Sequence, residues 1–369
     1  MRFLLLVLIL THGAIHLMGF AKAFDFGDLR QLTQPISRPV GLLWLLCSLG
    51  LITSGIVLII KPDIWLWVAA PAVLLSQALI FSSWRDAKFG TLANVILLVP
   101  LAAAVLEARP ESFRNQYRAA VREGLARSVD MPLVTEADLQ PLPAPVQQYL
   151  RYTGALGKPR VQNFRALFAG RFRNGFKSRW APFRAEQYDF FDQPTRFFWM
   201  RSSLFGLPAQ GLHVFRDSIA TMRIKVASLF RVVDAQGPQM NQGETVTLFN
   251  DLCLMAPACL IDTQRIHWSS AGPLDARARF THGGVTISAL LSFNQAGELT
   301  NFVSNDRFMS DDGQRYTSYP WSTPVRDYRE IDGRRLPSYG EAIWLTPEGQ
   351  FSYGEFHLLE IEYNLRQLK

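Results

Sequence analysis

Four long apolar segments occupy the first 107 residues of the chain, and no comparable run follows them. A bilayer core of ~30 Å needs roughly 20 apolar residues of helix, and a soluble domain has no reason to string several such runs together. The expected spans are residues 3–20, 40–60, 64–81 and 91–106, with short polar connectors between them. Residues 1–107 are therefore predicted to form a transmembrane bundle of antiparallel helices.

The first apolar segment also has the features of a signal peptide, because Arg2 precedes it and Ala21, Lys22 and Ala23 follow it. Polar residues inside the run and further spans behind it favour an uncleaved helix. Basic residues are divided almost evenly between the two sides of the bundle, so they fix its orientation weakly. Arg2 favours a cytoplasmic N-terminus and hence a cytoplasmic C-terminal domain, with a periplasmic domain as the alternative.

The character of the chain changes after the fourth span. Residues 108–140 are predicted to form a basic connector helix and a linker, because Arg114, Arg118 and Arg122 recur at a spacing of four and line one helical face. Such a helix either rests on lipid headgroups or is a solvated connector. Prolines at 141, 143 and 145 then break the chain, and a separate soluble domain is expected over residues 141–369.

Hydrophobic residues alternate with a period of two from Val161 onwards. Phe164, Phe168 and Phe172 fall on one face of a strand, and Arg165 and Arg171 fall on the other. Similar runs occupy residues 185–191, 196–203, 213–226, 277–282, 285–293, 299–309, 316–328, 336–344 and 351–363. The pattern predicts an α+β protein whose large antiparallel sheet curls into a half-barrel or barrel to cover its apolar face.

One apolar helix, expected over residues 243–260, interrupts the strands and is predicted to plug the concave side of the sheet. Glu244, Asn250 and Asp251 are the conspicuous polar residues of this helix, and they either bind a ligand or anchor the helix to neighbouring strands. Cys253 and Cys259 lie six residues apart in the same predicted helix and on different faces, so no disulfide is expected. Cys253 has no histidine at a recognisable spacing that would make it a nucleophile.

His12 and His16 share one face of the first span. Ionisable side chains inside a membrane usually face a bundle interior or a cavity, which allows a haem, metal or proton-transfer role. The alternative is helix-packing hydrogen bonds to polar side chains of other spans, namely Ser48, Thr53, Ser54, Ser76 or Gln77.

The net charge of +7 and the pI near 9.4 fit an anionic lipid surface better than nucleic acid once spanning helices are present. Nine basic residues and no acid lie between Arg151 and Arg184, interleaved with aromatic residues. The sequence contains no phosphate loop, dinucleotide fingerprint, Cys-x-x-Cys pair, HExxH or GxSxG motif. No cofactor, metal or nucleic-acid partner is therefore expected, and the absence of these motifs disfavours an enzyme.

Five segments resemble an uncharacterised family of bacterial multi-pass membrane proteins with a conserved C-terminal domain of unknown function. They are PISRPVGLLW at 35–44, NDLCLMAP at 250–257, GGVTISALLSF at 283–293, WSTPVRDYR at 321–329 and YGEF at 353–356. The resemblance implies a location in the bacterial inner membrane but carries over no activity or catalytic residue. At the level of fold alone, the predicted sheet is similar to the curved sheets of lipoprotein carriers that hold acyl chains.

These observations lead to one leading hypothesis and two alternatives. In the first, the β-domain binds a lipid-like or lipophilic ligand in the concavity of its sheet, and membrane lipids are the expected partners. In the second, the chain is an enzyme that uses Asp251, Glu244 or Glu341 as acid or base, which requires at least two of them to meet in one pocket. In the third, it is an assembly module with an exposed apolar patch and no internal cavity.

Overall fold

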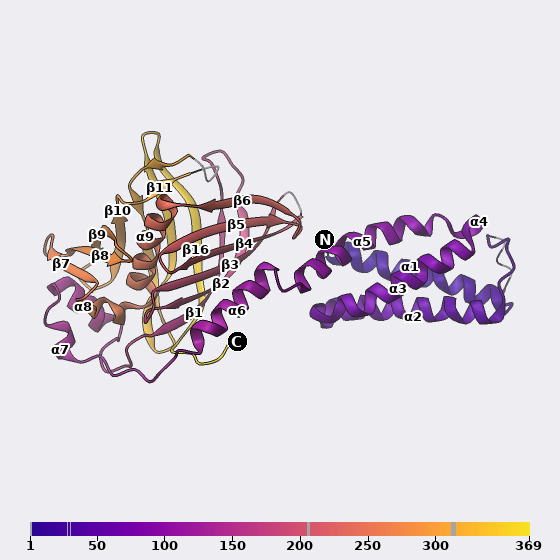
Figure 1. Cartoon of the computed structure of the whole chain (residues 1–369), viewed down its shortest axis with the longest axis horizontal. Coiled ribbons are helices and arrows are strands. Elements are labelled where there is room, and N and C mark those ends of the chain that lie inside the picture. Colours follow the sequence, from indigo (N-terminus) through magenta and orange to yellow (C-terminus); the bar gives the residue numbers. More distant parts are fainter. Residues whose placement is uncertain (1, 28, 30, 205–206, 311–314) are drawn as a thin grey trace. The chain divides into compact units, whose positions relative to one another are not determined.

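The computed structural model of the chain describes residues 2–27, 29, 31–204, 207–310 and 315–369 (Figure 1). It divides into two compact units, Met1–Arg109 and Pro110–Lys369. Each unit has hydrophobic clusters of its own. The first unit is helical and the second is built around a sheet.

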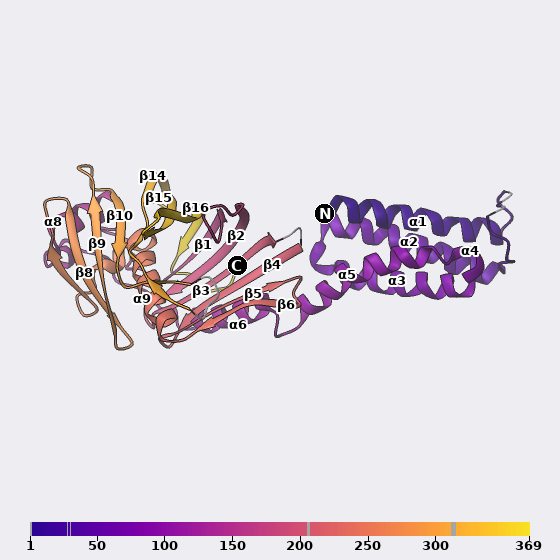
Figure 2. The same cartoon turned by 90° about the horizontal axis from the view of Figure 1, so that it is seen from above.

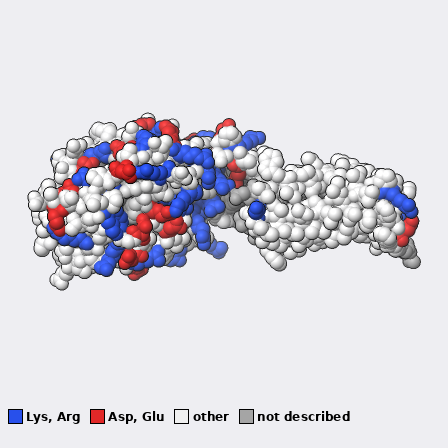
Figure 3. Space-filling model, turned by 90° about the horizontal axis from the view of Figure 1, so that it is seen from below, with Lys and Arg blue, Asp and Glu red and all other residues white. Residues whose placement is uncertain are grey.

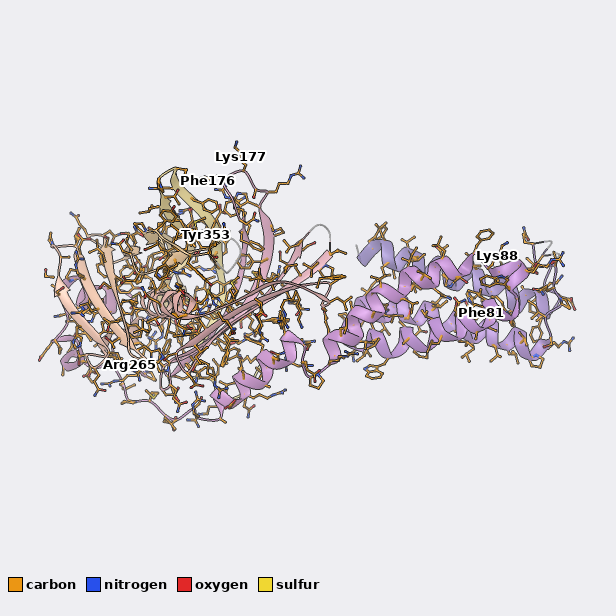
Figure 4. The ribbon with its side chains drawn as sticks, turned by 45° about the horizontal axis from the view of Figure 1, so that its top comes forward. Phe81, Lys88, Phe176, Lys177, Arg265 and Tyr353 are labelled. Carbon is orange, nitrogen blue, oxygen red and sulfur yellow. The ribbon has the colours of Figure 1, made fainter. Side chains whose placement is uncertain are left out.

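The helical unit contains α1 (Arg2–Ala23), α2 (Arg38–Ile60), α3 (Trp65–Ser82) and α5 (Gly90–Ala108), joined by the short η1 (Pro62–Ile64) and α4 (Trp84–Ala87). Among the described residues, four helices are long and apolar enough to cross a membrane. Figure 3 shows few charged side chains along the sides of this unit. Figure 4 places Lys88 and Phe81 towards the same end of the bundle.

Small residues let the helices of this unit approach closely. A Cβ at Gly19 would lie 2.3 Å from the Trp44 ring, and one at Gly41 would lie 2.3 Å from the Ala23 Cβ. Such contacts are the usual means of helix association where lipid removes the hydrophobic driving force. The pairing of α1 with α2 therefore depends on glycine at both positions.

The second unit contains an antiparallel sheet of fourteen strands among the described residues, in the order β6-β5-β4-β3-β2-β1-β16-β15-β13-β10-β9-β8-β7, with β14 paired to β15. The bounds are β1 (Asn163–Phe172), β2 (Ala181–Phe190), β3 (Thr195–Leu204), β4 (Leu207–Arg216), β5 (Ile219–Val226), β6 (Phe230–Gln236), β7 (Ile266–Ser270), β8 (Asp275–His282), β9 (Val285–Phe293), β10 (Leu299–Ser304), β13 (Trp321–Ser322), β14 (Val325–Ile331), β15 (Arg334–Thr346) and β16 (Gly349–Tyr363). Strands β11 (Phe308–Met309) and β12 (Thr317–Ser318) pair separately.

The sheet curls around one helix, α9 (Pro238–Met255), as Figures 1 and 2 show. Residues on every side of α9 are buried from Gly243 to Met255 except Thr247 and Leu254, which are half-buried. The Phe249 ring stacks on Phe280 of the sheet, with centroids 5.0 Å apart. The sequence-based prediction of an α+β fold with a curled antiparallel sheet and a helical insertion is confirmed.

The boundaries of the helical insertion differ from the prediction of one helix over residues 243–260. Helix α9 begins earlier, at Pro238, and ends at Met255 because Pro257 lacks the N–H that would continue the helix. A separate 3-10 helix, η2 (Pro257–Ile261), follows. Cys253 and Cys259 therefore lie in different helices, which corrects the prediction, and all three cysteines are free.

Some predicted strands are divided by tight turns. The run 213–226 contains parts of β4 and β5, because Asp217 and Ser218 have φ of 53° and 62° and form a hairpin turn. The run 316–328 is broken into β12, β13 and the start of β14. Strands β6 and β7, the two ends of the sheet, were not predicted from the sequence.

Helix α6 (Phe113–Leu125) covers the convex face of the sheet. Its residues Phe113, Tyr117, Val121 and Leu125 are buried. They pack in one cluster with side chains of β2, β3 and β4, namely Tyr188, Phe190, Phe197, Trp199 and Leu212. The basic stretch predicted as a connector is thus an amphipathic helix of the second unit, which also contains α7 (Glu136–Leu139) and α8 (Ala144–Tyr152).

Candidate functional site

A cavity of about 330 Å³ lies between the concave face of the sheet and α9. Most of its wall is apolar and comes from strands β1 to β5, β15 and β16 and from the end of α9. The strands contribute Phe168, Phe172, Phe183, Phe198, Met200, Met222, Ile224, Phe356 and Leu358, and α9 contributes Leu254 and Met255. The alternation that placed Phe168 and Phe172 on one face of β1 is the reason that these rings point inward.

The cavity also has a polar region centred on Arg196, which is 7% exposed. Its Nε donates to Asp251 Oδ2 over 2.7 Å, and its Nη1 donates to Glu244 Oε2 over 3.4 Å. Arg196 lies on β3, and both carboxylates lie on α9, so the guanidinium joins the helix to the sheet. A buried charge needs such partners, because burial without them is costly.

Gln187 of β2 extends this network to a second aspartate. Its side-chain N–H groups donate to Asp251 Oδ2 over 2.7 Å and to Asp189 Oδ1 over 3.0 Å. Burial raises the pKa of Asp189 well above its usual range, and the neighbouring Asp251 raises it further. Burial also raises the pKa of Asp251, although Arg196 opposes this effect. The network therefore favours a neutral Asp189.

Glu244 and His213 face each other beside Arg196. His213 Nε2 lies 3.3 Å from Glu244 Oε1, but neither atom has a hydrogen-bond partner among the described residues. Burial lowers the pKa of His213 to about 4, and Arg196 and Arg307 also act in this direction. Burial alone raises the pKa of Glu244, but His213, Arg196 and Arg307 outweigh it and leave the pKa lowered. At neutral pH the pair is thus a neutral imidazole beside a carboxylate.

Arg307 and Asn250 complete the polar region. The Arg307 guanidinium lies over the Trp321 ring, 4.2 Å from its centroid, and its buried Nε has no hydrogen-bond partner among the described residues. Asn250 donates to the Thr323 hydroxyl over 2.6 Å. The side chains of Asn250 and Thr323 are thus hydrogen-bonded to each other, whereas the Nε–H of Arg307 can donate to a further group.

Glu341 also lines the cavity, but it belongs to a separate polar group. It accepts hydrogen bonds from Tyr339 over 3.0 Å, from Ser352 over 3.1 Å and from Arg326 over 3.3 Å. Tyr353, whose position Figure 4 marks, lines the same cavity and accepts from Trp321 Nε1 over 3.1 Å. Glu341 therefore has protein partners on both oxygens.

The sequence singled out Glu244, Asn250 and Asp251, and the structure brings all three to one cavity together with Glu341. Sequence reasoning missed Gln187, Arg196, His213 and Arg307. A signal existed for Arg196, because it has the same strand parity as Phe198 and Met200 and therefore faces inward with them. His213 likewise has the parity of Gly211 on β4.

His12 and His16 lie within the helical unit and are buried. His12 Nε2 is 3.0 Å from both Ser76 Oγ of α3 and Asn94 Oδ1 of α5. His16 Nδ1 is 2.9 Å from the carbonyl oxygen of His12. His12 is thus part of a hydrogen-bond network between helices, whereas His16 bonds within its own helix. Asn94 is the partner that the sequence analysis overlooked.

Neither a metal site nor a reactive thiol is present in the part of the chain that the structure describes. No group of three His, Cys, Asp or Glu side chains there is arranged to hold a metal ion. Burial raises the pKa of the Cys253 thiol well above its usual range, which opposes formation of the thiolate. The chemistry of the cavity therefore depends on its carboxylates, His213 and the two arginines.

Sequence comparison places the cavity within a family domain. The model of a family of unknown function, DUF6544, matches residues 132–356, which include every polar residue named above for the cavity. The chain belongs to the DUF6544 family. No curated protein matches the sequence of this DUF6544 protein.

Two solved structures show a distant similarity to this DUF6544 protein. A LolA superfamily protein from Nitrosomonas europaea is 10% identical over 61% of this chain and 94% of its own, with a TM-score of 0.36. A putative outer membrane lipoprotein-sorting protein domain from Vibrio parahaemolyticus is 8% identical over 55% of this chain and 85% of its own, with a TM-score of 0.30. Scores this low carry no argument about function.

Proposed function

We propose that the β unit of this DUF6544 protein binds one amphipathic, lipid-like molecule in the cavity between the sheet and α9. The observation that supports this function is the composition of the cavity wall, which is apolar over most of its area and polar around Arg196. A volume of about 330 Å³ falls within the range of ~300–1,000 Å³ that small-ligand pockets usually have.

The apolar part of the wall fits a hydrocarbon chain. Burial of apolar surface is favourable by roughly 25 cal/mol per Å², and it does not depend on direction. Met200, Met222 and Met255 line this part of the cavity. Methionine side chains are flexible, so they adapt to chains of different length or shape. The cavity is therefore suited to a class of lipids more than to one rigid molecule.

The polar part of the wall fits a headgroup that both donates and accepts hydrogen bonds. Among the described residues, Glu244 Oε1 has no hydrogen-bond partner and can accept, whereas Arg307 Nε has none and can donate. A buried polar atom without a partner costs about 1–3 kcal/mol, so a headgroup that satisfies both atoms gains this amount. A purely hydrocarbon ligand would leave both atoms unsatisfied.

We further propose that the four long helices hold the protein in the bacterial inner membrane, with the β unit in the cytoplasm. Their length and apolar composition support a membrane location, and Arg2 ahead of the first span favours the cytoplasmic orientation. Reporter fusions after Lys369 would test the orientation. Activity of a periplasm-specific reporter at that position would reverse it.

Lipid analysis of the purified full-length chain tests the ligand. We expect extraction and mass spectrometry to recover a stoichiometric lipid from the wild type. Gly211→Phe introduces a ring into the cavity from β4, where the only contact closer than 3.8 Å to a new Cβ is the flexible end of Met200 at 3.3 Å. This variant should lose the lipid. Ala119→Phe adds the same ring on the exposed side of α6 and should retain it.

Comparison of the lipid recovered from the three proteins distinguishes lipid bound in the cavity from lipid carried over with detergent or membrane. Equal lipid in wild type, Gly211→Phe and Ala119→Phe would mean that the recovered lipid does not occupy the cavity. Absence of lipid from the wild type, with no protection of Met222 or Met200 from oxidation by added lipid, would contradict the proposal.

An enzyme is the second candidate, because Glu244, Asp251 and Glu341 line one cavity and Glu244 faces a neutral His213. Perturbed titratable groups in a cleft are typical of catalytic sites. Glu244→Gln distinguishes the two functions. A binding protein should carry the same lipid species in both forms, whereas an enzyme should accumulate a different species, its substrate, in the variant.

A further inference from the structure

One end of the sheet carries exposed apolar side chains where the β5–β6 turn lies beside the start of β4. The backbone N–H of Ala227, in the β5–β6 turn, donates to the carbonyl of Pro208 at the start of β4 over 2.7 Å. Around this contact Leu207 is 43% exposed, Leu229 56% and Phe230 65%. We call Leu207, Leu229 and Phe230 the apolar tip. Apolar residues clustered at such a site usually mark an interaction surface.

The backbone presents this tip in an unusual conformation. Ala227 and Ser228 have φ of 52° and 58°, and the N–H of Leu229 donates to the carbonyl of Val226 over 3.1 Å. Two residues with positive φ make a tight hairpin turn that glycine or asparagine usually occupies. The chain therefore holds Leu229 at the end of this turn, directly before β6, at some cost in backbone strain.

The apolar tip continues the wall of the cavity. Ile224 and Gly211 pair across β5 and β4, and both line the cavity. Two residues further along β5, Val226 pairs with Phe230 and with Ala209, so these side chains lie on the same concave face. An apolar surface thus leads from the inside of the cavity to exposed Phe230.

The tip lies at the end of the sheet where the chain enters the β unit from the last apolar helix. Phe113, at the start of α6, packs between Lys225 and Arg223 of β5, with its ring centroid 4.7 Å from Lys225 Nζ. Four residues, 109–112, lie between Phe113 and Ala108, where α5 ends. The five Cα–Cα steps from Ala108 to Phe113 reach at most roughly 18 Å, even when the chain is fully extended. The covalent connection between α5 and the end of the sheet that carries the tip is therefore short.

Basic side chains surround the tip on the convex side. The last residues of β3 and β5 include Arg201, Arg223 and Lys225. On β6, Arg231 follows Phe230. Arg231 is paired with Asp234, the acidic side chain nearest in this strand. Cationic side chains beside exposed apolar residues complement an anionic lipid surface, which can take up both kinds of side chain. An acidic soluble ligand fits less well, because it would leave Leu229 and Phe230 in water.

We propose that the apolar tip inserts into the surface of the bilayer that holds the chain's own helices, and that lipids enter the cavity along Ile224, Val226 and Phe230. The route rests on the proposed lipid-binding function, whereas the docking of the tip does not. The tip acts as a portal, because a lipid that moves along it exchanges one apolar environment for another without crossing water.

The full-length protein in phosphatidylcholine vesicles that contain phosphatidylglycerol provides the test. Nitroxide labels are attached to Leu229→Cys and Phe230→Cys in a Cys259→Ala background, since Cys47 and Cys253 are buried. Leu133→Cys is the matched control. Leu133 is 54% exposed and pairs with Pro159 near the start of β1, where Asn163 pairs with Phe190 at the opposite end of the sheet.

We expect both tip labels to collide more often with oxygen, which is concentrated in lipid, than with a water-soluble nickel chelate. The control label should show the reverse, and the lipid contact of the tip should weaken in pure phosphatidylcholine. Tip labels as accessible to nickel as the control would overturn the docking. Protection from both reagents would also overturn it, because that result indicates a protein partner such as a second copy of the chain.

Transfer of a fluorescent phospholipid from vesicles to the protein then tests the portal. The double variant Leu229→Asp/Phe230→Asp should slow uptake several-fold and leave the final amount of bound lipid unchanged, and Leu133→Asp should affect neither. Unchanged uptake with bound lipid present would overturn the portal and leave the proposed function intact. Lipid contact of the tip with no bound lipid in any form would instead overturn the proposed function.

Discussion

The two units of this protein each bury polar side chains in apolar surroundings, but they do so differently. In the helical unit, His12, Ser76 and Asn94 are joined by hydrogen bonds of about 3.0 Å. In the β unit, Arg196 is held between the carboxylates of Glu244 and Asp251. The first network is made of groups that are neutral or become neutral easily, whereas the second contains full charges that face a cavity.

This difference shows what each polar network is for. Hydrogen bonds between helices, such as those of His12 with Ser76 and Asn94, fix how the helices pack. In the charged network of the β unit, Glu244 Oε1 and Arg307 Nε have no hydrogen-bond partner among the described residues and lie at the wall of a cavity, where a further group could reach them. A polar residue in an apolar segment therefore either joins secondary-structure elements or lines a binding site, and the presence of a cavity distinguishes the two roles.

Removal of the central charge of the β network should have the largest effect. Arg196→Met leaves two buried carboxylates without their cation, and breaking such a pair usually costs about 3–5 kcal/mol. We expect a large fall in the unfolding temperature of the β unit, followed by near-ultraviolet circular dichroism in detergent. Arg184→Met, an exposed arginine of the neighbouring β2, should change stability by less than about 0.5 kcal/mol. Equal effects of Arg196→Met and Arg184→Met on stability would show that the charged network does not stabilise the β unit. The contrast with the hydrogen-bond network of the helical unit would then be lost.

The pH dependence of stability should identify the contribution of His213. Its pKa is lowered from 6.5 to about 4 in the folded protein, so below pH 6.5 the unfolded chain takes up a proton that the folded chain does not. Stability should fall as pH decreases from 6.5 to about 4, by about 3 kcal/mol if one pKa unit corresponds to ~1.4 kcal/mol.

Replacement of this side chain sharpens the test. His213→Gln lacks this contribution, so the stability of the wild type relative to the variant should decrease as pH falls from 6.5 to about 4. Asp189 and Asp251 have raised pKa values, so their contributions are present at low pH and decline as pH rises, and both remain in the variant. Parallel profiles of wild type and variant would show that His213 is protonated in the folded state.

The helical network should give the smallest effect. His12→Leu removes hydrogen bonds to Ser76 and Asn94, and such bonds contribute on average ~0.6 kcal/mol and at most ~1.7 kcal/mol in a membrane. Unfolding in bicelles with added dodecyl sulfate would measure the loss. Ser54→Ala is the control, because Ser54 donates to Leu51 of its own helix, and it should change stability less than His12→Leu. A loss as large as that of Arg196→Met would indicate a functional site in the bundle.

The sequence was sufficient to predict the architecture but only half of the candidate site. Apolar length predicted the helices, and period-two alternation predicted a curled sheet, because both patterns are local. Glu244, Asn250 and Asp251 were recognised because they interrupt an apolar helix. Arg196 and Gln187 were missed because in an alternating strand a polar residue normally faces solvent, and only the non-local curling of the sheet turns them inward.

Turn chemistry limited the rest of the prediction. The β5–β6 turn uses Ala227 and Ser228 at positive φ, where glycine or asparagine would have signalled a hairpin. Strand β6 was therefore not recognised, and the apolar tip was not recognised with it. The short connection between α5 and α6 was visible in the sequence, but the exposed apolar residues of the β5–β6 turn were not recognised.

The pairing of β1 with β16 has a consequence for how this chain is made. These strands join the β1–β6 half of the sheet to the β7–β16 half, and β16 follows all the other described strands in the chain. Until β16 is made, each half displays an unpaired strand edge, which is a template for association with other chains. Under the proposed membrane location, early insertion of the helices would hold neighbouring nascent chains apart on a surface during this interval and would reduce aggregation of the unfinished sheet.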